Sequence, residues 1–134
     1  MKFTSTNSRN QLRERQRRNR ATAPVLRNAY PQFASLRLEF DFSEPETSAP
    51  APQALVLHPP SQAYFVFPCP YADCDGEFDL TSVVATLARS GEASCEGHQQ
   101  CGGQRVRDHR GRLPCQLTLD YFIAPAEVAE HSAR

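Results

Sequence analysis

The sequence predicts a small α+β domain, built mainly from antiparallel sheet with one helix at about residues 80–90. Two stretches, residues 36–42 and 116–123, alternate between apolar and polar side chains, as strands with one buried face do. Between them, apolar residues recur at helical spacing. The chain has 134 residues, 40% of them hydrophobic, which suffices for one modest core and a flexible arm. We therefore expect a single folded domain.

The first 30 residues are expected to form a disordered, arginine-rich arm. Residues 1–27 contain eight basic side chains and one acidic one, so they carry a charge of +7 and the other 107 residues carry −7. A basic arm on an acidic body indicates a polyanionic partner. The alternative is that the arm folds back onto its own acidic domain. The arm arginines expected to bind nucleic acid are Arg9, Arg13, Arg15, Arg17, Arg18 and Arg20.

The same arm favours a helix that forms on binding. Good helix formers run from Ser8 to Arg20, and Pro24 would end a helix there. Helical spacing would place four arginines on one face: Arg9, Arg13, Arg17 and Arg20. Leu12 is the only large apolar side chain in this stretch, so the helix should stay unfolded without a partner. The stretch resembles the arginine-rich motifs of phage antiterminator and retroviral export proteins, which implies RNA binding.

Residues 31–123 are expected to form the folded domain. Its predicted strands are residues 36–42, 54–57, 62–67 and 116–123. The turn-rich segment His58–Ser61 suits a hairpin between the second and third strands. After the last strand, residues 124–134 are polar and rich in alanine, which predicts a flexible C-terminal tail.

The predicted helix has agreeing signals at both ends. Its apolar stripe consists of Leu80, Val83, Val84, Leu87 and Ala88. Asp79 can cap its start, Arg89 lies in the last turn, and Gly91 can adopt the left-handed conformation that ends a helix. We therefore place one helix between the third and fourth strands.

Five cysteines are the most informative feature of the domain. Cys69 and Cys74 have the spacing C-x4-C and are followed by Gly76, while Cys95 and Cys101 have the spacing C-x5-C and are followed by two glycines. Glycine lets backbone amides turn toward thiolate sulfurs. These loops resemble a zinc-ribbon or zinc-knuckle arrangement, although both are longer than C-x2-C. We therefore expect a Zn²⁺ ion bound by cysteines to staple the domain.

The ligand set stays open at this point. Cys115 follows Pro114 and could replace Cys101 as the fourth ligand, and His98 is a further candidate. The alternative is that the thiols are simply buried and inert. The candidate metal ligands are thus Cys69, Cys74, Cys95, Cys101 and Cys115, with His98 in reserve.

A second basic element lies between the cysteine loops and the last strand. Residues 105–112 read as a hairpin whose turn is flanked by Arg105 and Arg107, which we expect to contact nucleic acid. A solvated hairpin without a partner is the alternative.

Known catalytic motifs are missing from the sequence. It lacks the closing Glu of an EF-hand, the H-x-E of zinc deaminases, the C-x-x-C of thioredoxins and the Gly-Lys of a P-loop. It also has no run of 18 apolar residues that could span a bilayer. We therefore expect a cytoplasmic, non-enzymatic zinc protein that binds RNA on the ribosome or in a transcription complex. The alternative is an adaptor whose basic arm docks on an acidic protein surface.

Overall fold

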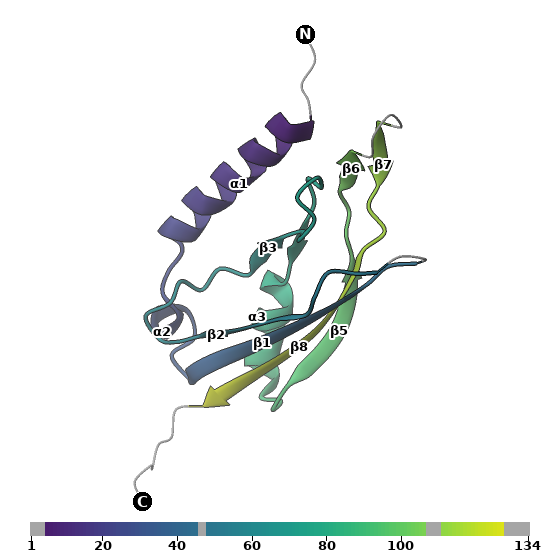
Figure 1. Cartoon of the computed structure of the whole chain (residues 1–134). Coiled ribbons are helices and arrows are strands. Elements are labelled where there is room, and N and C mark those ends of the chain that lie inside the picture. Colours follow the sequence, from purple (N-terminus) through teal and green to yellow (C-terminus); the bar gives the residue numbers. More distant parts are fainter. Residues whose placement is uncertain (1–4, 46–47, 107–110, 128–134) are drawn as a thin grey trace, which may run out of the picture.

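The computed structural model describes residues 5–45, 48–106 and 111–127, and it confirms the α+β fold class (Figure 1). The helices are α1 (Ser5–Thr22), α2 (Leu26–Ala29) and α3 (Thr81–Ser90). The strands are β1 (Phe33–Ser43), β2 (Gln53–Leu57), β3 (Val66–Pro68), β4 (Glu77–Asp79), β5 (Cys95–Gln100), β6 (Gln104–Val106), β7 (Arg112–Pro114) and β8 (Thr118–Glu127).

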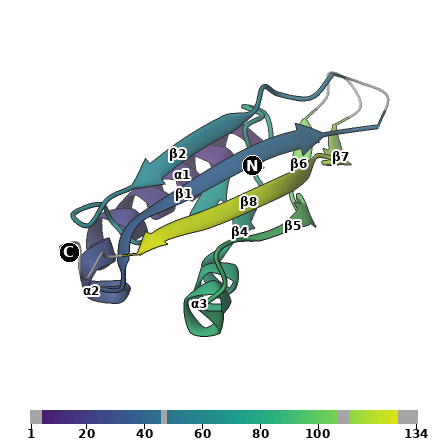
Figure 2. The same ribbon diagram turned by 90° about the horizontal axis from the view of Figure 1, so that it is seen from below.

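The main sheet has four antiparallel strands in the order β2-β1-β8-β5 (Figure 2). Its centre is the long pair of β1 and β8, in which Leu38 lies opposite Ile123. The predicted alternation holds there, because Leu36, Leu38 and Phe40 are buried while the residues between them are exposed. The remaining four strands form two short two-stranded ribbons, β3-β4 and β6-β7.

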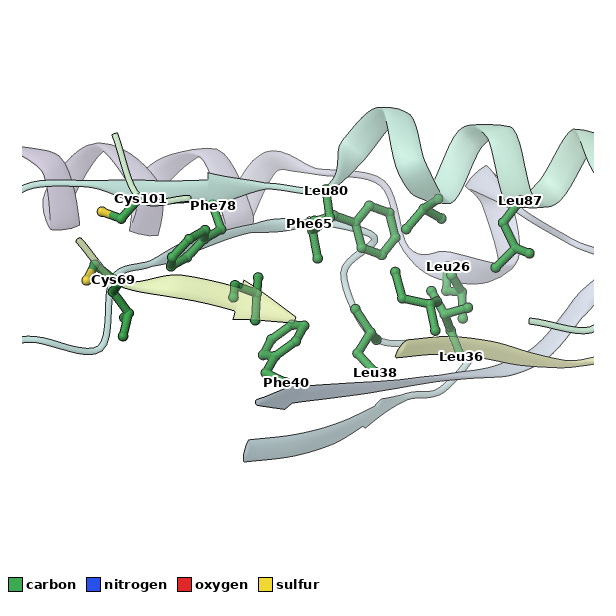
Figure 3. Close-up of a cluster of buried hydrophobic side chains, with 14 of the residues drawn as sticks. Leu26, Leu36, Leu38, Phe40, Phe65, Cys69, Phe78, Leu80, Leu87 and Cys101 are labelled. Carbon is green, nitrogen blue, oxygen red and sulfur yellow. The ribbon is translucent and has the colours of Figure 1, made fainter. Parts of the chain in front are cut away.

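The core lies between the main sheet and a second layer that contains the helices and the β3-β4 ribbon (Figures 1 and 3). Leu38 of the sheet, Phe65 of the segment before β3 and Leu80 before α3 are all at most 3% exposed. The other face of the sheet is largely exposed and carries charged residues together with Val56 and Phe122. The molecule therefore has two layers around one core.

Helix α3 forms as the sequence predicts. The Thr81 amide donates to Asp79 Oδ1 at 2.9 Å, and Gly91 ends the helix with φ 72°. Val84 and Leu87 bury the apolar stripe. This helix agrees with its local signals at both ends.

The predicted hairpin between residues 54–57 and 62–67 is wrong. Strand β2 pairs with β1 instead, and β3 covers only Val66–Pro68 and pairs with β4. The connecting segment bonds to the α2 region, where the Leu26 amide donates to the Ser61 carbonyl at 2.7 Å. Leu26 is fully buried, so this segment is fixed by tertiary contacts rather than by a hairpin ladder.

The amino-terminal segment is a packed helix in the structure, not a disordered arm. In α1, Leu12 is 7% exposed and Gln16 is 3% exposed, and Gln16 Nε2 donates to Glu77 Oε1 of β4 at 2.6 Å. A search for apolar residues alone overlooks such a face, because one of the two buried side chains among its described residues is polar. At the other end, β8 continues to Glu127 and includes residues expected in the tail, while residues 128–134 lie outside the described part of the chain.

Candidate metal centre

Four cysteines meet at one end of the core. They are Cys69, Cys74, Cys101 and Cys115, which follow β3, precede β4, follow β5 and follow β7. Each is at most 4% exposed, and their Sγ atoms all lie within 4.8 Å of one another. A tetrahedral ion with metal–sulfur bonds of about 2.3 Å separates its sulfurs by about 3.8 Å. The Sγ atoms of Cys74 and Cys101 are 3.6 Å apart, so the cluster has the size that a bound ion requires.

Two backbone knuckles present these sulfurs. In the first knuckle, residues 69–76, the Gly76 amide donates to Cys74 Sγ at 3.3 Å. In the second, residues 101–103, the Gly103 amide donates to Cys101 Sγ at 3.4 Å. Such N–H···S bonds stabilise a thiolate and orient it toward a metal. The amide-to-sulfur turn expected at the first cysteine pair is therefore present, and the second knuckle repeats it.

The remaining two cysteines are held in a matching way. The Cys69 amide donates to the Gly76 carbonyl at 3.1 Å, and the Cys115 amide donates to the Gly103 carbonyl at 3.0 Å. Each glycine thus donates to one cysteine of its pair and accepts from the other. The two pairs form two similar halves of one site.

The two knuckles pack directly against each other. A Cβ atom added at Gly76 would lie 2.8 Å from the Gly103 backbone nitrogen, so only glycine fits there without a shift of the backbone. Beside this contact, the Gln104 amide donates to Asp75 Oδ1 at 2.8 Å, and the Asp75 amide donates to the Gln104 carbonyl. The β6-β7 ribbon is therefore fastened to the first knuckle through its backbone.

Hydrogen bonds among the buried thiols shift their pKa values in opposite directions. Hydrogen bonding with Cys101 raises the pKa of Cys69, whereas hydrogen bonding with Cys101 lowers the pKa of Cys115. Some thiols of the cluster therefore lose their protons more readily than others. A divalent cation placed among them would favour loss of all four protons, because the thiolate is the form that binds metal.

An ion-pair network covers one side of the site. Arg105 Nε donates to Asp73 Oδ1 at 2.9 Å, lies 4.0 Å from Glu44 and stacks over the ring of Tyr71 with its guanidinium carbon 3.6 Å from the centroid. Burial, together with the hydrogen bond that Tyr71 donates to Glu44, raises the pKa of Tyr71 to about 12. The Arg105 side chain is 16% exposed. The positive charge of Arg105 is therefore paired with Asp73 and Glu44 within the protein.

Two of the candidate ligands lie away from the cluster. Cys95 begins β5 and pairs with Ile123, and burial raises the pKa of its thiol. His98 is exposed on the outward face of the same strand, opposite Asp120. The segment from Cys95 to Gln100 is an extended strand rather than a loop, and six residues of strand span about 20 Å. Cys95 therefore cannot share the site of Cys101.

The described arginines of α1 differ in their surroundings. Arg17 and Arg18 are about two-thirds exposed, and both contact Glu14, at 2.8 and 3.4 Å. The guanidinium of Arg20 lies over the ring of Tyr64, 5.0 Å from its centroid. Of the other predicted RNA contacts, Arg13 is half-buried and Arg15 is exposed. The side chain of Arg9 and all of Arg107 lie outside the described residues.

Sequence reasoning missed two residues that shape this region. Gln16 fixes α1 to β4, and Tyr64 receives Arg20. A glutamine carries no signal of burial, whereas the aromatic residues Tyr64, Phe65 and Phe67 are a signal from which local packing could have been predicted.

None of the helices in residues 5–45, 48–106 and 111–127 is long and apolar enough to cross a membrane. Comparison with known proteins yields no matching family model, no matching curated protein and no matching solved structure.

Proposed function

We propose that this chain is a zinc-stapled, non-enzymatic RNA-binding protein. The observation that carries the proposal is the position of α1, which is attached to β4, next to the first knuckle, through Gln16 and exposes arginines on its remaining surface. A metal bound at the cysteine site would stabilise the fold, and the arginines of α1 would contact the phosphates of the RNA.

Zinc is the metal that this donor set favours. Tetrahedral sites with four thiolates hold zinc or an iron–sulfur cluster, and knuckle turns with N–H···S bonds are common to small zinc sites. Four thiolates would complete the tetrahedral shell and leave no open position for a substrate. The proposed role of the ion is therefore structural.

The charge distribution favours a polyanionic partner. Residues 10–22 carry five arginines and one glutamate, a charge of +4, within one helix. The outward face of the main sheet lies on the side away from α1 (Figure 2). The strand register places four exposed carboxylates on that face: Glu39, Asp41, Glu96 and Asp120. A polyanion would be attracted to the α1 side and repelled from the sheet face. RNA fits this asymmetry, and the guanidinium fork suits phosphate oxygens.

The metal is tested by elemental analysis of protein purified under reducing conditions. We expect about one zinc per chain. Iron with visible charge-transfer absorption would replace the zinc proposal, and a folded protein without any metal would contradict a metal centre altogether. Cys95→Ser serves as the matched control, because this thiol lies outside the cluster.

RNA binding is tested by its salt dependence. If the six arginines from Arg9 to Arg20 each neutralise one phosphate, log affinity for single-stranded RNA should fall against log salt with a slope of roughly −4. Replacing Arg13 and Arg17 with Gln should reduce that slope by about one to two. The matched control replaces both with Lys, which keeps the charge. Absence of RNA binding at low salt, with binding to an acidic protein instead, would favour the adaptor function.

A further inference from the structure

An apolar groove opens beside the carboxyl-terminal part of α1. It has a volume of about 450 Å³ and lies between the inward face of β1 and β2 and the segment that leads into β3. Four apolar side chains line it, those of Phe40, Leu55, Leu57 and Phe67. Arg20, Gln53 and Tyr64 also line it. The groove therefore combines an apolar lining with one cationic side chain and two side-chain amides, those of Gln53 and Gln62.

The aromatic residues of this groove suit a flat ring. Phe40 and Phe67, which both line the groove, pack edge to face with centroids 5.1 Å apart. The Arg20 guanidinium carbon lies over the Tyr64 ring, 5.0 Å from its centroid, and both residues line the groove. Nucleobases stack on aromatic rings and guanidinium planes, and side-chain amides such as that of Gln53 bond to base edges.

The groove is continuous with the arginines of α1. Arg20 both lines the groove and belongs to α1, and helical spacing places Arg13 and Arg17 on the same side of the helix. Among the described residues that line the groove, one is cationic and none is acidic. An apolar peptide or a lipid chain would make no use of this charge, whereas a nucleotide carries a base for the groove and a phosphate for the arginines.

We propose that this groove binds one unpaired base of a single-stranded RNA whose phosphates lie along α1. The inference rests on the proposed function and adds the substrate class. A base can enter the groove only when it is unstacked, and bases in an RNA duplex are not. The protein should therefore prefer single strands to duplexes.

The test compares two labelled probes, a 12-nucleotide single-stranded RNA and a 12-base-pair RNA duplex, on the full chain. Tyr64→Leu removes the stacking ring and keeps an apolar side chain. It should lower affinity for the single strand by roughly 5- to 150-fold, the range known for loss of one base–aromatic stack, and change duplex affinity less than twofold. Tyr64→Phe should restore single-strand affinity, because its ring still stacks.

Two matched arginine variants distinguish binding in the groove from the general effect of positive charge on RNA affinity. Arg20→Gln and Arg18→Gln each remove one exposed positive charge from α1, but only Arg20 lines the groove. Both should reduce the salt slope to a similar extent, and only Arg20→Gln should reduce the preference for single strands. Equal loss of that preference in both variants would overturn the assignment.

Wild-type protein provides a measurement that does not depend on how a variant folds. A single strand carrying 2-aminopurine should lose fluorescence when that base stacks in the groove. Binding of both probes with equal affinity and unchanged 2-aminopurine fluorescence would overturn the base site while leaving RNA binding intact. Binding of neither probe at low salt would overturn the proposed function and this inference together.

Discussion

The two ends of the core are held together by different means. At the sheet end, Leu26, Leu36 and Leu87 meet in a fully apolar cluster, whereas Cys69 and Cys101 lie at the opposite end (Figure 3). The sheet end rests on the ten register pairs of β1 and β8, while the cysteine end rests on three-residue strands. Phe78 of β4 is buried there, but isolated two-stranded ribbons are at best marginally stable, so the cysteine end gains from another source of stability. A bound metal would supply it.

The largest effect is expected from loss of the metal. Removing zinc with a chelator, or replacing Cys74 with Ser, should unfold the cysteine end, because structural zinc contributes on the order of 10 kcal/mol of apparent folding free energy. Hydrogen exchange should accelerate at the Gly76 and Gly103 amides, while amides of the β1-β8 pair keep part of their protection. Uniform loss of protection in both regions would show that the two ends are one cooperative unit.

Leu38→Ala is the counterpart at the sheet end. Leu38 is fully buried opposite Ile123, so its truncation should lower the free energy of unfolding by about 2 to 5 kcal/mol in denaturant titrations. Zinc stoichiometry in the folded protein should stay the same. A variant that folds but no longer binds zinc would mean that the sheet end shapes the metal site directly.

A smaller and more local effect is expected in α1. Leu12→Ala removes apolar contact from a helix with only two buried side chains, Leu12 and Gln16, among its described residues. The loss should weaken docking of α1 by about 2 kcal/mol. Hydrogen exchange should become faster in α1, with little change in β1 and β8. The control is Gln11→Ala, an exposed position next to it that should change nothing.

The smallest effect is expected for Cys95→Ser. Cys95 is partly buried on β5 and outside the four-cysteine cluster, so zinc content should not change. Stability should fall by at most about 1 kcal/mol, since a hydroxyl replaces a thiol of similar size. Loss of zinc in this variant would contradict the ligand set.

The parts of the fold that sequence analysis predicted are those fixed by local pattern. The strand that begins near Leu36 and the helix that ends at Gly91 follow from alternation, helical spacing and a terminal glycine. Strand β5 escaped prediction because its six residues, Cys95 to Gln100, include no large aliphatic or aromatic side chain. Its position is set by pairing with β8 at the sheet edge, which no local signal encodes.

In the candidate site, too, some residues could be predicted from local sequence pattern and others only from tertiary contacts. Cys69 and Cys74 are close in sequence, and their loop signal was readable. The sequence left Cys101 and Cys115 as alternatives, whereas the structure places both in the cluster and leaves Cys95 outside it. That outcome required topology, because Cys115 reaches the site only when β6 and β7 pair and lie against the first knuckle. The buried face of α1 could not be predicted from local sequence either, because the partner of Gln16, Glu77, lies 61 residues away in the chain.

The contact between Gly76 and Gly103 limits how this protein can change over evolutionary time. Neither residue can gain a side chain without displacing the other backbone, so both are expected to persist wherever the cysteine pairs persist. Descendants of this chain could then be found with a compact signature, C-x4-C-x-G followed by C-x-G-x11-C, with free variation between the two halves. Because each half carries two cysteines of the cluster and one glycine, a search that requires both halves would separate relatives from proteins that share only one cysteine pair.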